Sequence, residues 1–239
     1  MKHRVKQIDG RTIALCCALM ISAIATLPQA HSGTREQAKR MHDRLAGVPP
    51  SNEVLDNMQR LISEGNTRGA ADMAMDNPAF YSVTLKNWIT PWTNEDSDIF
   101  APLNDYTATV IGMTRDEIDF RQILSGDILY VGKVSTGVPA YSINSNAHYQ
   151  GLEDQSANLK EVLQATTQSA LTAVPSDATA GVMTTRAAAK AYFKDGTNRA
   201  MFRFTLINHL CTDLEGLKDT SRSPDRIRQD VSRSPGGDS

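Results

Sequence analysis

The chain has 239 residues, of which 40% are hydrophobic and 22% charged, with a formal net charge of -2. This composition excludes a disordered chain and a nucleic-acid-binding protein with a basic face, and a mean hydropathy of -0.36 excludes a polytopic membrane protein. The length is enough for one large domain or two small ones with a buried core. Three cysteines are too few for a disulfide framework.

The first thirty residues have the pattern of a secretory signal peptide. Residues 1–11 carry four basic side chains and one acid, and residues 12–27 then run without a charge. A basic start, a short apolar stretch and small residues after it are typical of such a peptide, which is cleaved after Ala25 or after Ala30. The apolar stretch is shorter than the roughly 20 residues that span a bilayer, which favours cleavage over an uncleaved anchor. We therefore expect a periplasmic or secreted protein with no stable membrane span after processing.

Cleavage after Ala30 would leave an acidic chain with a single cysteine. The 21 basic and 26 acidic residues that remain give a net charge of -5, so we expect no nucleic acid or anionic lipid as partner. Cys211 is then an unpaired thiol in an oxidising compartment. Its position in an apolar segment predicts burial in the core or in an interface, with a distant thiol partner as the alternative.

Apolar residues at helical spacing run through most of the remaining sequence. The first half predicts a helix capped by Ser51 and ended by Gly65, together with further helices over residues 34–46, 68–75, 79–90 and 104–113. The second half predicts helices over residues 119–130, 156–171, 177–193 and 198–214. Only residues 128–131 and 141–143 resemble short strands.

These elements predict a mainly α fold, an irregular multi-helix bundle with long loops, over residues 31–217. Residues 132–150 are rich in Gly, Pro, Ser and Asn, which indicates a long loop and a possible boundary between two subdomains. Residues 218–239 hold few apolar side chains and no aromatic residue. They are predicted to form a polar linker or tail.

The sequence lacks the common catalytic signatures. It has no H-E-x-x-H, G-x-S-x-G, S-x-x-K or Walker motif, so no reaction is indicated. It also has no C-x-x-C-H, so this chain cannot itself attach a c-type haem covalently. The acids near Asp116 and Asp119 could serve a hydrolase, but charges at helix ends explain them adequately.

An acidic segment offers weak candidates for a metal site. Asn94, Asp96 and Asp98 alternate as calcium-loop ligands do, and Asp105 follows at the twelfth position. The turn position, however, holds Ile99 in place of Gly, and the last ligand is Asp in place of the bidentate Glu. A solvated acidic loop is therefore favoured, and no metal is expected.

Three histidines and two tryptophans are further candidates. His42, His148 and His209 are weak candidates for cofactor binding, with a packed or surface position favoured for His42 and an exposed loop position for His148. His209 lies two residues before Cys211, and on a helix the two side chains point apart. Trp88 and Trp92 could form a binding surface, although such a cluster more often anchors a core.

Three segments together resemble a known family. Residues 42–58 (HDRLAGVPPSNEVLDNM), 104–132 and 180–211 resemble, in this order, helical elements of the planctomycete-type cytochrome c proteins. They cover about half of the mature chain. The third element precedes a haem motif in that family, but here Ala200 and Met201 replace its Arg-Gly pair.

The resemblance implies an exported helical module of undetermined activity beside a c-type haem. The haem would lie on a segment downstream or on a partner protein, and none would be held by this chain. The alternative, from the residues alone, is a periplasmic binding or scaffold module without a redox role, with Trp88 and Trp92 as its contact surface.

Overall fold

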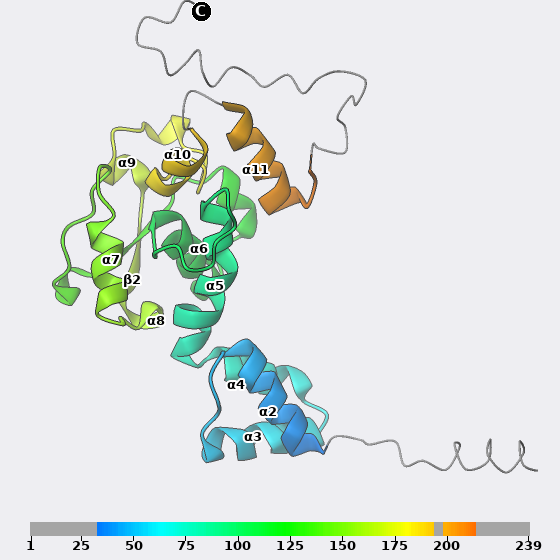
Figure 1. Cartoon of the computed structure of the whole chain (residues 1–239). Helices are drawn as coiled ribbons and strands as arrows, with labels where there is room; N and C mark the ends of the chain where they lie inside the picture. The colour runs from blue at the N-terminus through cyan, green and yellow to red at the C-terminus, as the bar shows by residue number, and fades with distance from the viewer. Residues whose placement is uncertain (1–32, 194–197, 214–239) are drawn as a thin grey trace, which may run out of the picture.

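The computed structural model describes residues 33–193 and 198–213. The described part is mainly helical and contains one small sheet (Figure 1), which confirms the mainly α prediction. Within it, no helix combines the length and the apolar character that a membrane span requires. The predicted signal peptide (1–30) and polar tail (218–239) lie outside the described residues.

Three helices at the N-terminus form a small unit with its own apolar cluster. They are α2 (Thr34–Leu45), α3 (Asn52–Ser63) and α4 (Thr67–Met75), and they lie together below the rest of the molecule in Figure 1. The predicted cap is present, because the Ser51 hydroxyl accepts the Val54 N–H at 3.2 Å. The cluster is made of small and aliphatic side chains: Ala38, Leu55, Met58, Ala70 and Ala74.

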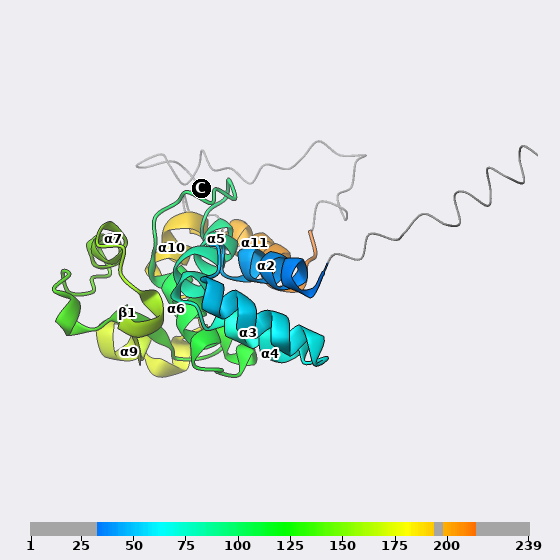
Figure 2. The ribbon, with the colours of Figure 1, turned by 90° about the horizontal axis from the view of Figure 1, so that it is seen from below.

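The larger body is built around α6 (Asp105–Arg115), whose first nine residues are all buried. It is surrounded by the other elements in both views (Figures 1 and 2). The segment before it is helical, as predicted for residues 79–90, but changes type from the π-helix η1 (Phe80–Leu85) through α5 (Lys86–Ile89) to the 3₁₀ helix η2 (Thr90–Thr93).

The helix predicted over residues 119–130 is wrong, and the short strand that residues 128–131 resemble is confirmed. This segment forms the 3₁₀ helix η3 (Phe120–Leu124) and then strand β1 (Leu129–Gly132), which pairs antiparallel with β2 (Leu163–Thr166). All four residues of β1 are buried, so the strand shows none of the alternation that identifies a half-exposed strand. Contacts with α6 and β2, distant in sequence, decide its conformation.

The helix predicted over residues 156–171 is also divided, into α8 (Leu159–Val162), β2 and α9 (Gln168–Leu171). The Arg115 guanidinium on α6 donates hydrogen bonds to the carbonyls of Lys160 (2.9 Å) and Leu163 (2.8 Å). These carbonyls therefore find a tertiary partner, and the chain is free to leave the helix and pair with β1.

The loop predicted over residues 132–150 contains the short helix η4 (Val134–Thr136) and ends where α7 (Ala147–Asp154) begins. Val138 and Tyr141 pack against the same apolar cluster as β1 and α7. This loop therefore does not separate two apolar clusters. Along the chain, the change from the N-terminal cluster to the larger one falls between α4 and η1.

The last described elements are η5 (Ser176–Ala178), α10 (Arg186–Tyr192) and α11 (Asn198–Leu210). The predicted helix over residues 177–193 is thus much shorter than expected. Cys211 follows α11 in the left-handed conformation, with φ of 50°, and is exposed. Its predicted burial in the core of the chain is therefore not observed, because α11 ends one residue before it; burial in an interface and a distant thiol partner stay predictions.

Candidate functional site

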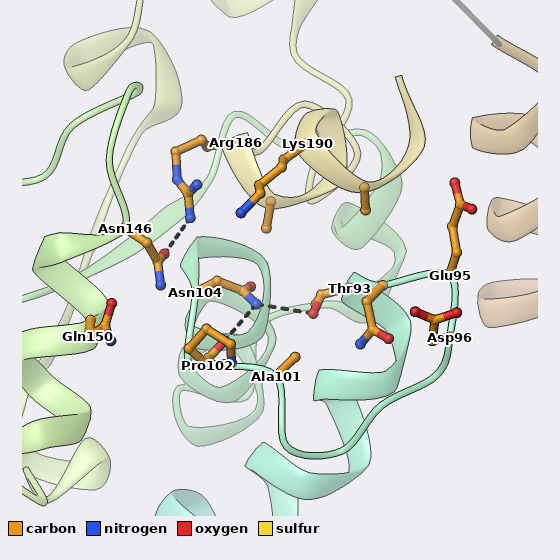
Figure 3. Close-up of a pocket in the computed structure, with 13 residues that line it drawn as sticks. Thr93, Glu95, Asp96, Ala101, Pro102, Asn104, Asn146, Gln150, Arg186 and Lys190 are labelled. Atoms are coloured by element: carbon orange, nitrogen blue, oxygen red, sulfur yellow. Dashed lines mark hydrogen bonds between the residues drawn. The ribbon is translucent and has the colours of Figure 1, made fainter. Parts of the chain in front are cut away.

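A cavity of about 370 Å³ lies where three segments distant in sequence meet. The loop after η2, the first turns of α7 and one side of α10 form its walls (Figure 3). A volume of this size is at the lower end of the range for sites that hold small molecules. Its polar lining residues are Thr93, Asn94, Glu95, Asp96, Asn104, Asn146, Gln150, Arg186 and Lys190.

Asn104 forms a rigid part of the wall. Its amide nitrogen donates to Thr93 Oγ1 (3.1 Å) and to the Pro102 carbonyl (3.2 Å), while its oxygen caps α6 by accepting the Thr107 N–H at 3.0 Å. The side chain is buried. Because its hydrogen-bonding capacity is used internally, Asn104 shapes the cavity and fixes the start of α6.

Arg186 is held in one orientation at the cavity. One terminal nitrogen, Nη2, donates to Asn146 Oδ1 (Figure 3), and Asn146 is fixed in turn by donating to the Leu103 carbonyl at 2.8 Å. The Arg186 Nε–H is buried without an acceptor among the described residues. The charge therefore faces the cavity on a preorganised side chain that forms no ion pair with a carboxylate in the described part of the chain.

Asp105 fixes the backbone at the same place. Its carboxylate accepts the backbone N–H groups of Arg186 (2.7 Å) and Ala187 (2.9 Å), which otherwise have no partner in the first turn of α10. Burial raises the pKa of Asp105, and the Ala187 N–H and the Arg186 charge act in the opposite direction. Asp105 thus ties α6 to α10 and occupies the positive end of this helix.

Four charged side chains at the cavity make no ion pair with any residue that the structure describes. Arg186 and Lys190 lie on α10, and Glu95 and Asp96 lie on the loop at the other end of the cavity (Figure 3). The amide of Gln150 is exposed beside the cations. The cavity therefore combines a fixed wall with free groups of both signs at its two ends.

A second cavity, of about 420 Å³, lies beside η1 and offers a useful contrast. Its charged residues satisfy each other, because Lys86 forms an ion pair with Glu153, whose second oxygen accepts the Leu103 N–H at 2.9 Å. No uncompensated charge on these two residues is left for a ligand. The first cavity is therefore the better candidate for ligand binding.

The four residues predicted as weak metal ligands do not form a site together. Asn94 folds the loop onto itself, with its oxygen accepting the Asp98 N–H at 2.7 Å, and Asp105 is buried against α10. Across residues 33–193 and 198–213, no group of three or more His, Cys, Asp or Glu side chains is placed to hold a metal ion.

Two of the candidate histidines have structural hydrogen bonds. His42 is buried, with Nδ1 2.9 Å from the Val48 carbonyl. His148 is also buried, which corrects the expectation of an exposed loop position: Gly132 N–H donates to its Nε2 at 2.8 Å, and its Nδ1 lies 2.6 Å from the Pro139 carbonyl. The start of α7 at Ala147 packs this ring against β1.

His209 lies in an aromatic cluster under α11. Its Nε2 is 2.8 Å from the Tyr106 hydroxyl, and its ring meets Trp92 edge to face at 5.6 Å. Burial lowers the pKa of His209. The cluster fastens α11 to the body. Cys211 lies beyond the end of the helix and is exposed, so the predicted helical relationship between the two side chains does not apply.

The two tryptophans occupy different environments. Trp88 is 68% exposed on α5, whereas Trp92 is half-buried and packs against the core. Neither lines the two cavities described above.

The remaining carboxylate candidates are paired: Asp116 with Arg115 and the Tyr130 hydroxyl, and Asp119 with Arg121.

Sequence reasoning named some lining residues, Asn94 and Asp96, but for a different chemistry, and it missed Arg186, Lys190, Asn104 and Asn146. A local signal exists, since Arg186 and Lys190 are four residues apart and so share a helical face. Their acidic counterparts lie about ninety positions earlier, however, and only the fold brings them to one cavity.

Comparison with protein-family models, with curated proteins and with solved structures finds no match for this chain. The functional argument therefore depends on the geometry of the cavity.

Proposed function

We propose that this chain is a binding module that holds a small polar ligand with an anionic group in the cavity between α7, α10 and the loop after η2. The observation that carries the proposal is Arg186, a partly buried cation that Asn146 orients and that forms no ion pair with any described residue. The Asp105 carboxylate, which accepts the Arg186 backbone N–H, offsets the charge only in part. Keeping such a charge partly buried without an ion pair is unfavourable. A ligand carboxylate would supply the missing partner.

The proposed contacts come from side chains that are otherwise free. Arg186 uses Nη2 on Asn146, which leaves Nη1 for the ligand. Lys190 adds a second positive charge one turn along α10, and Gln150 adds an amide from α7. Charge-assisted hydrogen bonds of this kind contribute about 1.5–3 kcal/mol each, enough for specific binding of a small anion.

Isothermal titration with N-acetyldiglycine, a small carboxylate that carries no positive charge, tests this function. We expect Arg186→Gln to weaken binding by about tenfold and Lys190→Gln by about threefold, because each loses one charged contact. Arg68→Gln removes an exposed positive charge from α4, outside the cavity, and is the matched control. Circular dichroism of each variant establishes that it is folded.

Two results would contradict the proposal. One is equal affinity in the wild type, Arg186→Gln and Lys190→Gln, which would place the binding site elsewhere. The other is no binding of the probe at millimolar concentration. The Lys190 variant keeps the test valid if Arg186→Gln fails to fold, because Lys190 is exposed and forms no ion pair with any described residue.

A second proposal keeps the association with a haem protein that the family resemblance implies. We propose that the exported chain packs beside a c-type haem domain through α11. The observation that favours this surface is the exposure of Phe202 (59%) and Leu210 (60%), two turns apart on the same helix. A patch that exposed apolar side chains form together on one helix is a candidate contact surface, whereas single exposed ones are ordinary.

The second proposal is tested by immobilising the purified chain and passing over it a periplasmic extract of the source cells. We expect a polypeptide that stains for covalent haem to be retained by the wild type and lost in the double variant Phe202→Ser/Leu210→Ser. The double variant Val134→Ser/Ile143→Ser removes exposed apolar side chains elsewhere and is the control. Absence of any haem-staining polypeptide, or its equal retention by Phe202→Ser/Leu210→Ser, would contradict the proposal.

A further inference from the structure

The cavity carries two separate pairs of charges, a positive pair on α10 and a negative pair on the loop after η2. Glu95 and Asp96 lie on the loop from Asn94 to Asp98, which Asn94 closes by two hydrogen bonds: it donates to the Asp98 carbonyl (3.0 Å) and accepts the Asp98 N–H (2.7 Å). A closed loop of this kind holds its side chains near one place. The hydrogen-bonded loop therefore keeps both acids at the edge of the cavity.

Neither acid has a basic partner among the residues that the structure describes. Burial is the main cause that raises the pKa of Tyr192 on α10, and the charge of Glu95 raises it further. Both acids are therefore at the cavity while Arg186 and Lys190 occupy its other end (Figure 3).

This distribution selects among ligand charges. A ligand with two or three negative charges would be attracted by Arg186 and Lys190 but repelled by Glu95 and Asp96, and a simple cation would meet the opposite problem. A ligand with one charge of each sign, at its two ends, satisfies both pairs. The volume of about 370 Å³ limits it to a small molecule.

We infer that the ligand is a zwitterion of the amino-acid or short-peptide class, with its carboxylate on Arg186 and Lys190 and its ammonium group on Glu95 and Asp96. This inference rests on the proposed binding function and adds the second half of the recognition. The exposed amide of Gln150 lies on the α7 side of the cavity, away from Glu95 and Asp96 (Figure 3), where it can add a hydrogen bond to the carboxylate end of the ligand.

The experiment compares triglycine with two blocked relatives of similar length, N-acetyldiglycine and triglycine amide, by isothermal titration. We expect triglycine to bind about tenfold more tightly than either, because each blocked peptide loses one charge-assisted contact. Diglycine and tetraglycine, measured beside it, establish the length that best spans the two charge pairs.

A double variant, Glu95→Gln/Asp96→Asn, isolates the negative pair. It is expected to weaken triglycine and triglycine amide by about tenfold and to leave N-acetyldiglycine unchanged or bound more tightly. Lys190→Gln is expected to do the reverse, weakening triglycine and N-acetyldiglycine but not triglycine amide. Both substitutions change exposed side chains, so the fold is retained.

The outcomes separate this inference from the function on which it rests. If N-acetyldiglycine binds as tightly as triglycine, and the Glu95→Gln/Asp96→Asn variant changes neither, the zwitterion inference is wrong and the anion-binding function stands. If no peptide binds at millimolar concentration, both are wrong. If triglycine binds but no variant of the cavity alters its affinity, the site lies elsewhere and the assignment to these four charges is overturned.

Discussion

The carboxylate of Asp105, at the start of α6, accepts a 2.7 Å hydrogen bond from the backbone N–H of Arg186, 81 residues later in the chain. The same carboxylate accepts the Ala187 N–H at 2.9 Å and is fully buried. An aspartate at the start of a helix often caps that helix, but Asp105 of α6 caps the start of α10. The contact joins the central helix to the helix that carries both cations of the cavity.

Asp105→Asn is expected to destabilise the fold by about 2–4 kcal/mol, because the amide keeps one acceptor and turns an NH₂ group toward backbone N–H donors in a buried site. Urea denaturation measures the change. Asp127→Asn is the matched control: Asp127 also accepts a helix-end N–H, from Ser169 at 3.0 Å, but is partly exposed. A loss of no more than about 1 kcal/mol is expected there. Equal losses in the two variants would contradict the central role of Asp105.

Gly112→Ala is expected to destabilise the fold by about 3 kcal/mol or more, because the added Cβ would lie 2.1 Å from Tyr130 Cδ1. The ring cannot retreat easily, since Tyr130 is buried and its hydroxyl donates to Asp116 at 2.7 Å. Gly137→Ala is the control. Its Cβ would meet nothing within 4 Å, so only the cost of its φ of 69°, about 1–2 kcal/mol, applies. A smaller loss at Gly112 than at Gly137 would refute the packing argument.

His209 is expected to make the stability of the protein depend on pH. Burial lowers its pKa from 6.5, so as the pH falls the unfolded chain binds the proton before the folded one does. The stability contributed by neutral His209 is therefore complete above about pH 6.5 and decreases as the pH falls toward the lowered folded-state value. The midpoint of thermal unfolding should fall more steeply between pH 7.5 and 5.5 in the wild type than in His209→Gln.

The pH comparison depends on the difference between the two proteins, because other groups titrate in both. His31→Gln removes a histidine outside the described residues and serves as the control for loss of a titrating ring. Parallel curves for the wild type and His209→Gln would show that the contact between His209 and Tyr106 does not require the neutral ring.

Cys211 is expected to react with iodoacetamide in the native protein, because its thiol is exposed beyond the end of α11. Peptide mapping by mass spectrometry identifies the labelled position and separates Cys211 from the other cysteines. We expect labelling at similar extents with and without urea. Labelling that requires urea would restore the original prediction of a buried thiol.

Periodicity in the sequence was sufficient to predict a helix where the helix is amphipathic and its ends carry local capping signals. Helix α3 is the clearest case, since Ser51 caps it and its apolar stripe faces α2 and α4. For strand β1 the sequence left two readings, the end of a helix over residues 119–130 and a short strand over residues 128–131. It could not decide between them because all four residues of β1 are buried, which removes the period of two. The pairing of β1 with β2 and the packing of Tyr130 on Gly112 are both tertiary contacts.

The sequence alone determined that this chain is mainly helical, with a helix over most segments where apolar residues recur at the helical period. Those signals lie within a few residues of each other, and local hydrogen bonding and burial of one face are enough to produce them. Only the tertiary structure decided that Glu95, Asp96, Arg186 and Lys190 meet at one cavity. Their approach depends on Asp105 joining α6 to α10, and no short-range pattern encodes a contact between residues so far apart in the chain.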